Sequence, residues 1–424
     1  MADPDRATRV LVPLAGLGLL TLFLVVDAEL GQPAPAAARE RVPDGLARPS
    51  PGDGLNLPGP PTVTVRLVGA LGRRTRFTCG VDGPYRLVEG AHDEASAGRD
   101  ALAAGDGLSA ATVGAADGRV TLNGVPLART LTLVPERGAT VEVGDRRYRG
   151  TLVLEAGDDG RVVASNRVDL EEYVAGVLFA EMPERFETAA HRAQTVSVRT
   201  YALARTLSGK GLRDDQGSQV YAGVARETEE GRRIVRSTRG EVLTWEGRVF
   251  SAYFHSTCGG RTSSARDVFG PDAPPPISAS VECGGCDGTR WSRWRRVLRG
   301  EDLARLYHGS FGSTLTARVE RTDASGRVLS LEVRDAAGEV IDRPVADRFR
   351  NDYNRGRPLD ESLLSAWFRL RPGGDGATLA EGRGFGHGVG LCQYGADGLA
   401  ERGADHRRIL ATYYPGSRLE RAYD

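Results

Sequence analysis

The fold of this chain is constrained most strongly by residues 169–205, where two helices are expected on either side of a proline. Apolar side chains recur at helical spacing in the first half and predict one buried helix face, formed by Leu170, Tyr173, Val174, Val177 and Leu178. Asp169 is a suitable N-cap, and Glu172 three positions later completes a capping-box pattern. The helix must end near Met182, because Pro183 disfavours the helical conformation of the residue before it. A second helix is expected in the remainder of the stretch.

This ending places Glu181 in the last turn of the first helix. The negative end of the helix dipole disfavours a charged carboxylate there, so we expect the pKa of Glu181 to be raised. A carboxylic acid that stays partly protonated near neutral pH is suited to general acid catalysis. The alternative is an ordinary solvated glutamate, because perturbed carboxylates mark functional sites only statistically.

The composition restricts the size of the fold and the class of partner. A chain of 424 residues allows two or three domains and ample core. Its 56 basic and 56 acidic residues give a formal net charge of zero, which argues against a nucleic-acid partner. The sequence contains no phosphate-binding GxxxxGKS/T loop, no GxSxG nucleophile motif and no HExxH zinc motif.

Four segments are expected along the chain. Residues 1–26 contain the uncharged apolar run Val10–Val26, which predicts an export signal peptide or an uncleaved membrane anchor and places the rest outside the cytoplasmic membrane. Residues 27–61 are rich in Pro, Ala and Gly and predict a linker. Residues 62–146 contain short alternating runs cut by glycine turns, which predict a small all-β domain. Residues 147–424 mix strands and helices, so the predicted fold class is α+β.

The cysteines indicate a metal site. Cys283 and Cys286 have the CxxC spacing of a zinc knuckle, and the two glycines between them allow both thiolates to face one ion. His255 and Cys258, three positions apart, and Cys392 are further candidate ligands. Four such ligands would form a closed tetrahedral site for a structural zinc ion. The alternative is one or two disulfides, which an exported protein can form.

Six motifs follow one another in the second part of the chain: LEEYVAGVLFAEMP, AHRAQTVSVRTYAL, SQVYAG, FSAYFHSTCGGRTSSARDVFG, GRGFGHGVGLCQYGA and ILATYYPGS. In this order they resemble the SpoIID/LytB family (sporulation stage II protein D and amidase enhancer). The resemblance covers roughly residues 147–418, nearly two thirds of the chain. The short segment AEMP alone would be weak evidence for the family, whereas several long motifs in the same order are specific evidence for it. The resemblance implies that residues 147–424 form a SpoIID-like catalytic domain.

The resemblance also implies roles for individual residues. Glu181 occupies the position of the family's catalytic acid. Six residues would line a sugar-binding cleft: Gln219, Tyr221, His255, Ser256, His387 and Gln393. Tyr221 is equally compatible with a place in the core. Three residues of the second helix are expected to support the site: Gln194, Arg199 and Tyr201. Some family members have serine at the cysteine positions, so a zinc ion would be structural and not required for the chemistry.

The activity that the resemblance implies is that of a peptidoglycan lytic transglycosylase in the cell envelope. With Glu181 as the one clear carboxylate, the C6 hydroxyl of N-acetylmuramic acid (MurNAc) would attack its own C1. The bond to N-acetylglucosamine (GlcNAc) would break and leave a 1,6-anhydro end. Asp267 is a second carboxylate that could instead make the protein a hydrolase.

Two further alternatives belong to other functional classes. The chain could be a non-catalytic glycan-binding activator of a cell-wall amidase. It could also be a zinc amidase that uses His255 and Cys258, but three or four sulfur ligands would leave no open position for a water molecule.

Overall fold

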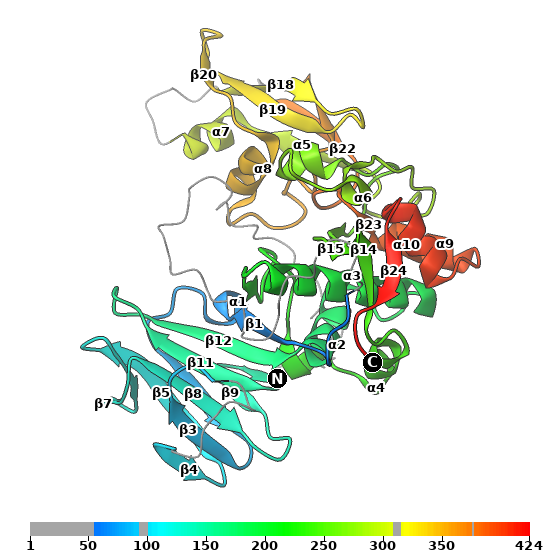
Figure 1. The fold of residues 1–424 in the computed structure, drawn as a ribbon. Helices are drawn as coiled ribbons and strands as arrows, with labels where there is room; N and C mark the ends of the chain where they lie inside the picture. The colour runs from blue at the N-terminus through cyan, green and yellow to red at the C-terminus, as the bar shows by residue number, and fades with distance from the viewer. Residues whose placement is uncertain (1–54, 93–100, 308–314, 375–376) are drawn as a thin grey trace, which may run out of the picture.

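The computed structural model describes residues 55–92, 101–307, 315–374 and 377–424. The predicted signal peptide or anchor and the first part of the predicted linker lie outside the described residues. Within these ranges, none of the helices combines the length and the apolar character needed to cross a membrane. The fold is α+β, as predicted, with two large sheets, a central group of helices and a smaller mixed unit (Figure 1).

The two large sheets lie at the lower left of Figure 1 and share one hydrophobic core. The first sheet has the spatial order β13 (Leu212–Arg213), β1 (Thr62–Arg66), β12 (Val162–Asp169), β11 (Thr151–Ala156), β8 (Thr130–Pro135), β3 (Tyr85–Glu89) and β4 (Ala103–Gly105). The second has the order β10 (Arg146–Tyr148), β9 (Val141–Val143), β2 (Phe77–Val81), β5 (Leu108–Ala116), β6 (Arg119–Leu122) and β7 (Val125–Pro126). A single helical turn, α1 (Val68–Leu71), follows β1. Burial alternates along β12, as the period of two in a strand requires when one face meets the core.

Two of the predicted segment boundaries need correction. The boundary at residue 146 does not separate two sheets, because β11 and β12, which follow it, pair with β8 and β1, which precede it. Strand pairing between distant parts of the chain therefore joins the predicted β domain to the rest. The linker is also shorter than predicted: in residues 55–61, Leu55 is buried and the N–H of Leu57 donates to the carbonyl of Ala422 at 2.7 Å.

Strand β12 leads directly into the helix that was expected to end at the proline. This helix, α2 (Leu170–Glu181), is capped by Asp169, whose carboxylate accepts hydrogen bonds from the N–H groups of Glu171 and Glu172 at 2.8 and 3.3 Å. Met182 is already extended, as expected for a residue before proline. The predicted start and end of the helix are both confirmed.

The helix is buried on more than the one face that the sequence predicted, and an amphipathic helix with an exposed face opposite is not what forms. Every residue from Leu170 to Phe179 is buried except Glu172. The second half of the capping box is also absent: the carboxylate of Glu172 pairs with Arg149 and Arg232 instead of turning back to the N-cap. The sheets cover one side of α2, and the helices α3 (Thr188–Leu207) and α4 (Glu229–Ser237) cover others.

A second hydrophobic core lies on the far side of α3. It includes residues of β14 (Glu241–Trp245), which pairs with β15 (Arg248–Val249) and β24 (Arg418–Arg421). It also includes residues of α9 (Gln393–Glu401) and α10 (His406–Tyr413). Within it, β16 (Phe254–His255) runs parallel to β23 (Leu391–Cys392). This pairing brings two motifs together that are more than 130 residues apart in the chain.

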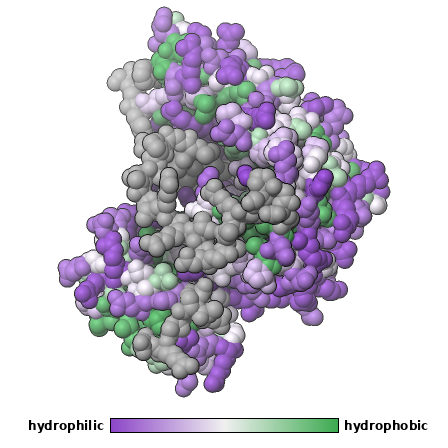
Figure 2. Space-filling model, in the orientation of Figure 1, coloured by the Kyte–Doolittle hydropathy of each residue, from purple (hydrophilic) through white to green (hydrophobic). Residues whose placement is uncertain are grey.

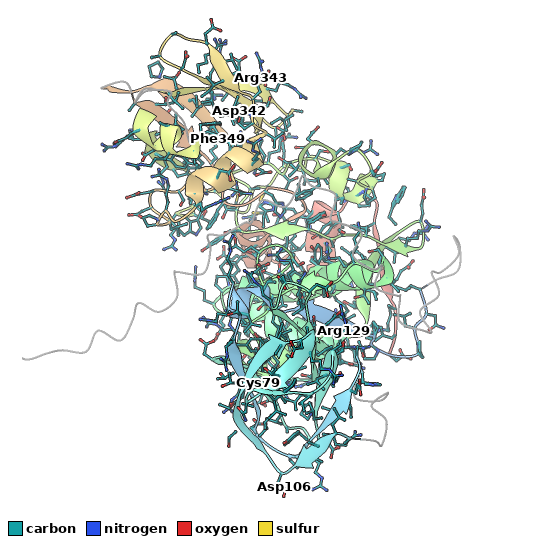
Figure 3. All side chains as sticks on the ribbon, turned by 90° about the vertical axis from the view of Figure 1, so that its left-hand side faces the viewer. Cys79, Asp106, Arg129, Asp342, Arg343 and Phe349 are labelled. Atoms are coloured by element: carbon teal, nitrogen blue, oxygen red, sulfur yellow. The ribbon has the colours of Figure 1, made fainter. Side chains whose placement is uncertain are left out.

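A third core, which we call the upper unit, spans residues 294–385 and lies at the top of Figure 1. It contains two three-stranded sheets: β17 (Trp294–Leu298), β22 (Thr378–Gly382) and β21 (Phe368–Pro372) in one, and β18 (Thr316–Thr322), β19 (Val328–Arg334) and β20 (Val340–Asp342) in the other. Helices α7 (Gly300–Leu306) and α8 (Ala346–Asn354) complete it. In the side view, labelled residues of the upper unit and of the large sheets lie at opposite ends of the molecule (Figure 3). Hydrophilic side chains dominate the described surface in the view of Figure 2.

Candidate active site

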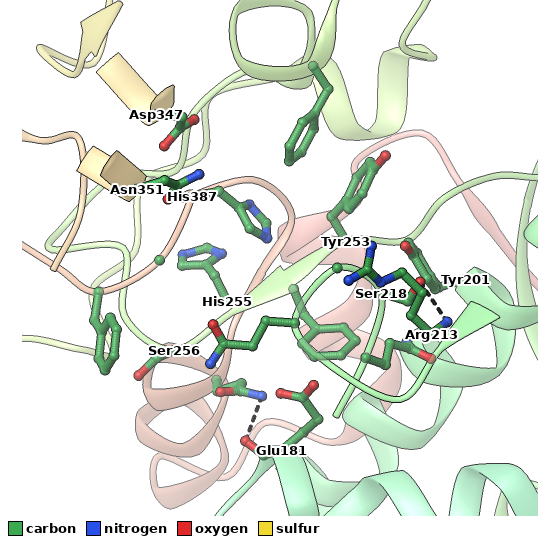
Figure 4. A pocket seen from close by; sticks show the side chains of 18 of the residues that line it. Glu181, Tyr201, Arg213, Ser218, Tyr253, His255, Ser256, Asp347, Asn351 and His387 are labelled. Carbon is green, nitrogen blue, oxygen red and sulfur yellow. Dashed lines mark hydrogen bonds between the residues drawn. The ribbon is translucent and has the colours of Figure 1, made fainter. Parts of the chain in front are cut away.

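A cavity of about 480 Å³ lies between the central helices and the upper unit (Figure 4). Its lining comes from the end of α2, the last turns of α3, residues 213–219, residues 253–256, α8 and residues 385–387. The volume falls within the range of ordinary small-molecule sites, and the lining mixes aromatic and polar groups as such sites do. Segments that are far apart in the sequence therefore meet in the wall of this cavity.

Six of the seven residues predicted for catalysis or sugar binding line this cavity: Glu181, Gln219, His255, Ser256, His387 and Gln393. The seventh, Tyr221, does not. Its side chain is 1% exposed, and its hydroxyl donates to Oδ1 of Asn166 at 2.9 Å. Its ring packs against Tyr148 and Tyr173 in the core of the large sheets. Of the two roles considered for Tyr221, the structure supports the core position.

Glu181 lies at the floor of the cavity, at the end of α2. Its Oε1 accepts a hydrogen bond from the N–H of Val220 at 2.5 Å, and its backbone carbonyl accepts one from Nε2 of Gln393 at 3.0 Å. Burial raises the pKa of Glu181 to about 7, although the Val220 bond acts in the opposite direction. The direction agrees with the sequence-based expectation, but the cause is desolvation rather than the helix dipole.

Gln219 occupies the wall beside Glu181 and is 1% exposed. Its Oε1 accepts a hydrogen bond from the hydroxyl of Tyr173 at 2.9 Å, which fixes the orientation of the amide. Its Nε2 has no hydrogen-bond partner among the described residues. A buried donor without a partner is costly, so this N–H₂ group is suited to bind an acceptor atom of a ligand.

The backbone of one residue, Val389, fixes the tautomers of both cavity histidines. The carbonyl of Val389 lies 3.1 Å from Nδ1 of His255, so that nitrogen carries the proton. The N–H of Val389 donates to Nδ1 of His387 at 3.1 Å, so His387 carries its proton on Nε2. Burial lowers the pKa of His387 to about 4 and holds that of His255 well below its usual value. Both rings are therefore neutral near pH 7.

Nε2 of His255 is consequently an acceptor without a partner among the described residues. Figure 4 shows this ring and the Glu181 carboxylate approaching the cavity from different sides. The cavity thus offers a proton donor at Glu181, an N–H₂ donor at Gln219 and a neutral acceptor at His255. This combination suits an uncharged, hydroxyl- and amide-bearing ligand such as an amino sugar.

The sequence analysis missed an aromatic wall of the cavity. The ring of Tyr253 stacks on Phe269 with centroids 4.4 Å apart, and His387 meets both rings edge-on. Tyr253 and Phe269 lie in the motif FSAYFHSTCGGRTSSARDVFG, so their position in the chain was a usable signal. Tyr201, which was expected mainly to support the site, lines the cavity directly.

Helix α8 supplies a wall that no motif predicted. Asp347, Arg350 and Asn351 line the cavity from the upper unit, and the Asp347 carboxylate lies 3.3 Å from the Arg350 guanidinium. Asp267, the predicted second carboxylate of a hydrolase, is exposed on α5 (Ala265–Phe269) and does not line the cavity.

Four cysteines form a buried cluster behind the histidines: Cys258, Cys283, Cys286 and Cys392. Their sulfur atoms all lie within 4.8 Å of one another, and the Cys258 and Cys286 sulfurs are 3.5 Å apart. A tetrahedral zinc–thiolate site with bonds of about 2.3 Å places its sulfurs roughly 3.8 Å apart, so the four residues fit zinc. None of the five cysteines forms a disulfide in this structure.

Hydrogen bonds to sulfur hold the cluster together. Sγ of Cys392 accepts from the N–H groups of Cys258 and Gly395 at 3.2 and 3.3 Å, and the hydroxyl of Tyr413 lies 3.0 Å from Sγ of Cys283. A hydrogen bond from the Cys258 thiol holds the pKa of Cys283 well below its usual value. His255, which was also predicted as a ligand, is not part of the cluster, because its ring faces the cavity and Val389.

Comparisons with known proteins show the family to which the chain is related. Residues 158–245, which include Glu181 and Gln219, match the family model described as stage II sporulation protein. Stage II sporulation protein D of Bacillus subtilis (strain 168) is 30% identical over 278 residues, which cover 60% of this chain and 75% of that protein. The amidase enhancer of the same organism is 26% identical over 287 residues, covering 58% of this chain and 40% of that protein. An uncharacterized protein of Brachyspira hyodysenteriae is 29% identical over 274 residues, covering 63% of this chain and 71% of that protein.

The fold and the site define an α+β protein with a half-buried carboxylic acid of raised pKa at the floor of a polar and aromatic cavity. The chain belongs to the SpoIID/LytB family, as its motifs predicted.

Proposed function

We propose that this protein is an exported lytic transglycosylase that cleaves the MurNAc–GlcNAc bond of peptidoglycan glycan strands, with Glu181 as general acid and base. The observation that carries the proposal is the Glu181 carboxyl group, which lies in the cavity with a pKa raised to about 7. Such a group is partly protonated at neutral pH and can give a proton to a leaving oxygen. The neutral donors and acceptors around it suit an amino-sugar strand.

The proposed reaction needs one carboxyl group and no added nucleophile. The Glu181 proton moves to the glycosidic oxygen, which leaves as the 4-hydroxyl of GlcNAc as its bond to C1 of MurNAc breaks. The C6 hydroxyl of the same MurNAc forms a bond to C1, and its proton moves to the Glu181 carboxylate, so the acid is regenerated. Because the attack is intramolecular, it has a large effective-molarity advantage over attack by water.

Two observations weigh against a hydrolase of the kind considered from the sequence. Two-carboxylate hydrolysis requires both groups to flank the bond that is cut. Asp267 lies outside the cavity, and Asp347, the other carboxylate among the described lining residues, sits on α8 beside Arg350. The 1,6-anhydro product is therefore the outcome that the proposal requires.

The test is mass spectrometry of peptide-stripped glycan strands after incubation with the full chain. The full chain is required because the large sheet crosses residue 146 and a fragment beginning at residue 147 would lose β1 and β8. We expect products that end in 1,6-anhydro-MurNAc with the wild-type protein and none with Glu181→Gln. Products with reducing ends would contradict the transglycosylase proposal and indicate that the protein is a hydrolase.

A second candidate function is activation of a cell-wall amidase, which the name of one relative suggests. Under this alternative, the cavity would bind glycan without cleaving it. An assay with an added amidase separates the two, because a non-catalytic activator would raise amidase activity equally in the wild type and in Glu181→Gln. The raised pKa of Glu181 favours the catalytic proposal.

Export is part of the same proposal, because peptidoglycan lies outside the cytoplasmic membrane. Residues 1–26 are proposed as the signal or anchor. Fractionation of cells that express the full chain tests this, and recovery of the protein in the cytoplasmic fraction would contradict it.

We also propose that the four clustered cysteines bind a structural zinc ion. A bound ion would hold the loops that carry Cys258 and Cys283 against α9, and the catalytic chemistry would not involve it. The test is the zinc content of protein purified without chelator, where we expect one equivalent per chain. A content below about one tenth of an equivalent would rule the site out.

A further inference from the structure

Arg327 is a charged side chain of the upper unit that is almost completely buried, with an exposed fraction of 1%. It stands directly before β19, after a tight turn organised by Asp323. Oδ1 of Asp323 accepts the N–H groups of Ser325 and Arg327 at 2.8 and 2.9 Å, and the N–H of Asp323 donates to the carbonyl of Arg327 at 2.8 Å. This turn fixes the direction in which the Arg327 side chain leaves the hairpin.

The guanidinium of Arg327 reaches the cysteine cluster. Its Nη2 donates to the carbonyl of Cys258 at 2.9 Å. Its Cζ lies only 2.3 Å from where a Cβ on Gly388 would stand, so a residue with a side chain at position 388 would collide with it. Gly388 also has a φ of +83°, which favours glycine on its own. The GHGVG loop is thus shaped to admit this guanidinium.

Most of the hydrogen-bonding capacity of Arg327 is unused. Nε and Nη1 have no hydrogen-bond partner among the described residues. The carboxylate of Asp323 is occupied elsewhere, because Oδ1 holds the turn and Oδ2 accepts from the hydroxyl of Ser263 at 3.0 Å. The Asp323 and Asp347 carboxylates act on the guanidinium from a distance, but among the described residues neither forms an ion pair with it. A buried guanidinium without an ion pair is unfavourable, so a further negative charge close to it would be stabilising.

The cysteine cluster can supply that charge. Four thiolates and one zinc ion carry a net charge of 2 − 4 = −2, and Cys258 is both a cluster residue and the direct partner of Arg327. The positive guanidinium and the negative cluster therefore stabilise each other across the boundary between two hydrophobic cores.

We propose that Arg327 is the charge-compensating partner of the metal-bound cysteine cluster and that the pair fastens the upper unit to the catalytic core. Because α8 packs on β19 within the upper unit, this contact also positions the α8 wall of the cavity. Arg327 is a positioning residue and touches no substrate. The proposal rests on the zinc site and not on the transglycosylase activity, so the two can fail independently.

The first test measures metal affinity by competition with a chromophoric chelator, using Zn²⁺ and the spectroscopic probe Co²⁺. Loss of a group that supports metal ligands commonly weakens affinity by about 10–100-fold, and we expect a loss in this range for Arg327→Met. Arg327→Lys, which keeps the charge, should recover part of it. Arg321→Met is the matched control, because Arg321 is an exposed arginine of the same hairpin. Unchanged affinity in Arg327→Met would overturn the proposal.

The second test uses the wild-type protein and so does not depend on whether a variant folds. Hydrogen–deuterium exchange is measured with zinc bound and after its removal by a chelator. We expect faster exchange at residues 323–334 and in α8 after removal, with β11 of the large sheet unchanged as an internal control. Equal exchange of the 323–334 hairpin in both states would overturn the proposal. Failure of the cysteines to bind any metal would also overturn it, but would not affect the test of Glu181 as the catalytic acid.

Discussion

The backbone N–H of Val220 donates a 2.5 Å hydrogen bond to Oε1 of Glu181, a residue 39 positions earlier in the chain. This bond favours the ionised carboxylate, yet the pKa of Glu181 is raised to about 7, because burial outweighs it. Gln393 holds the backbone carbonyl of the same residue from a third segment. The candidate acid is therefore fixed in position by two segments that are distant in the sequence, and its surroundings keep it partly protonated.

Replacement of the acid should stop cleavage without unfolding the protein. General acid–base catalysis contributes about 10²–10⁴-fold to a rate, so Glu181→Gln should lower the rate of glycan cleavage by at least that range. The measurement is product formation by mass spectrometry, with glycan binding measured alongside to show that the cavity is intact. Asp267→Asn is the control and should keep full activity, because Asp267 lies outside the cavity. A strong loss in Asp267→Asn would contradict the assignment of a single acid.

The activity should fall as the pH rises through about 7. Glu181 must carry its proton to act as an acid, and its pKa is about 7, so kcat/KM should drop by about tenfold per pH unit above that value. The cavity histidines should add no inflection near pH 7, because burial keeps their pKa values lower. A pH–rate profile checks both points. A rate that increases from pH 7 to pH 9 would be incompatible with Glu181 as the acid.

The same group should make the protein less stable at high pH. The pKa of Glu181 rises from an ordinary 4.5 to about 7 on folding, so the folded state binds more protons between these values. The stabilisation that accompanies this proton is complete below pH 4.5 and is lost as the pH rises through 7. Glu181→Gln removes this dependence, and we expect its free energy of unfolding to gain on the order of 2 kcal/mol over the wild type between pH 5 and pH 8. Denaturant unfolding at both pH values measures it, and parallel changes in the two proteins would disprove the effect.

Substitutions at His255 and Tyr221 should have different effects: the first should weaken glycan binding, and the second should lower the stability of the fold. His255→Ala removes a cavity acceptor, so glycan affinity should fall by about tenfold, in line with the loss of one hydrogen bond. Tyr221→Phe leaves Oδ1 of Asn166 buried without its partner, which should cost about 1–3 kcal/mol of stability and leave glycan affinity unchanged. Binding isotherms and unfolding curves on both variants test these two expectations. Weaker glycan binding by Tyr221→Phe would indicate that Tyr221 contributes to the sugar-binding site after all.

Substitution of a cluster cysteine should change the zinc content and the thermal stability, whereas substitution of the isolated cysteine should not change the zinc content. Cys286→Ser should lower the bound zinc and reduce the thermal midpoint, because a structural metal contributes directly to folding free energy. Cys79→Ser is the matched control: Cys79 is equally buried but lies on β2 in the large sheets. Metal analysis and thermal unfolding on the two variants provide the comparison. Equal zinc content in Cys286→Ser and the wild type would exclude that cysteine as a ligand.

The features that the sequence predicted correctly depend on local chemistry. Asp169 caps α2 through its own neighbours, and Pro183 ends the helix by a clash with the residue before it. The motifs also located Glu181, the histidines and the four cysteines, because each motif keeps its chemical groups within a few residues of one another.

Tertiary structure alone decided which of these groups meet. His255 and Cys258 are three residues apart, yet one faces the cavity and the other the cysteine cluster, because β16 pairs with β23 and the chain turns directly after it. Tyr221 packs into the core, and the wall formed by α8 carries no motif. Long-range strand pairing and packing select among partners that local sequence leaves equivalent, and they also set the pKa of Glu181, which depends on burial by segments far away in the chain.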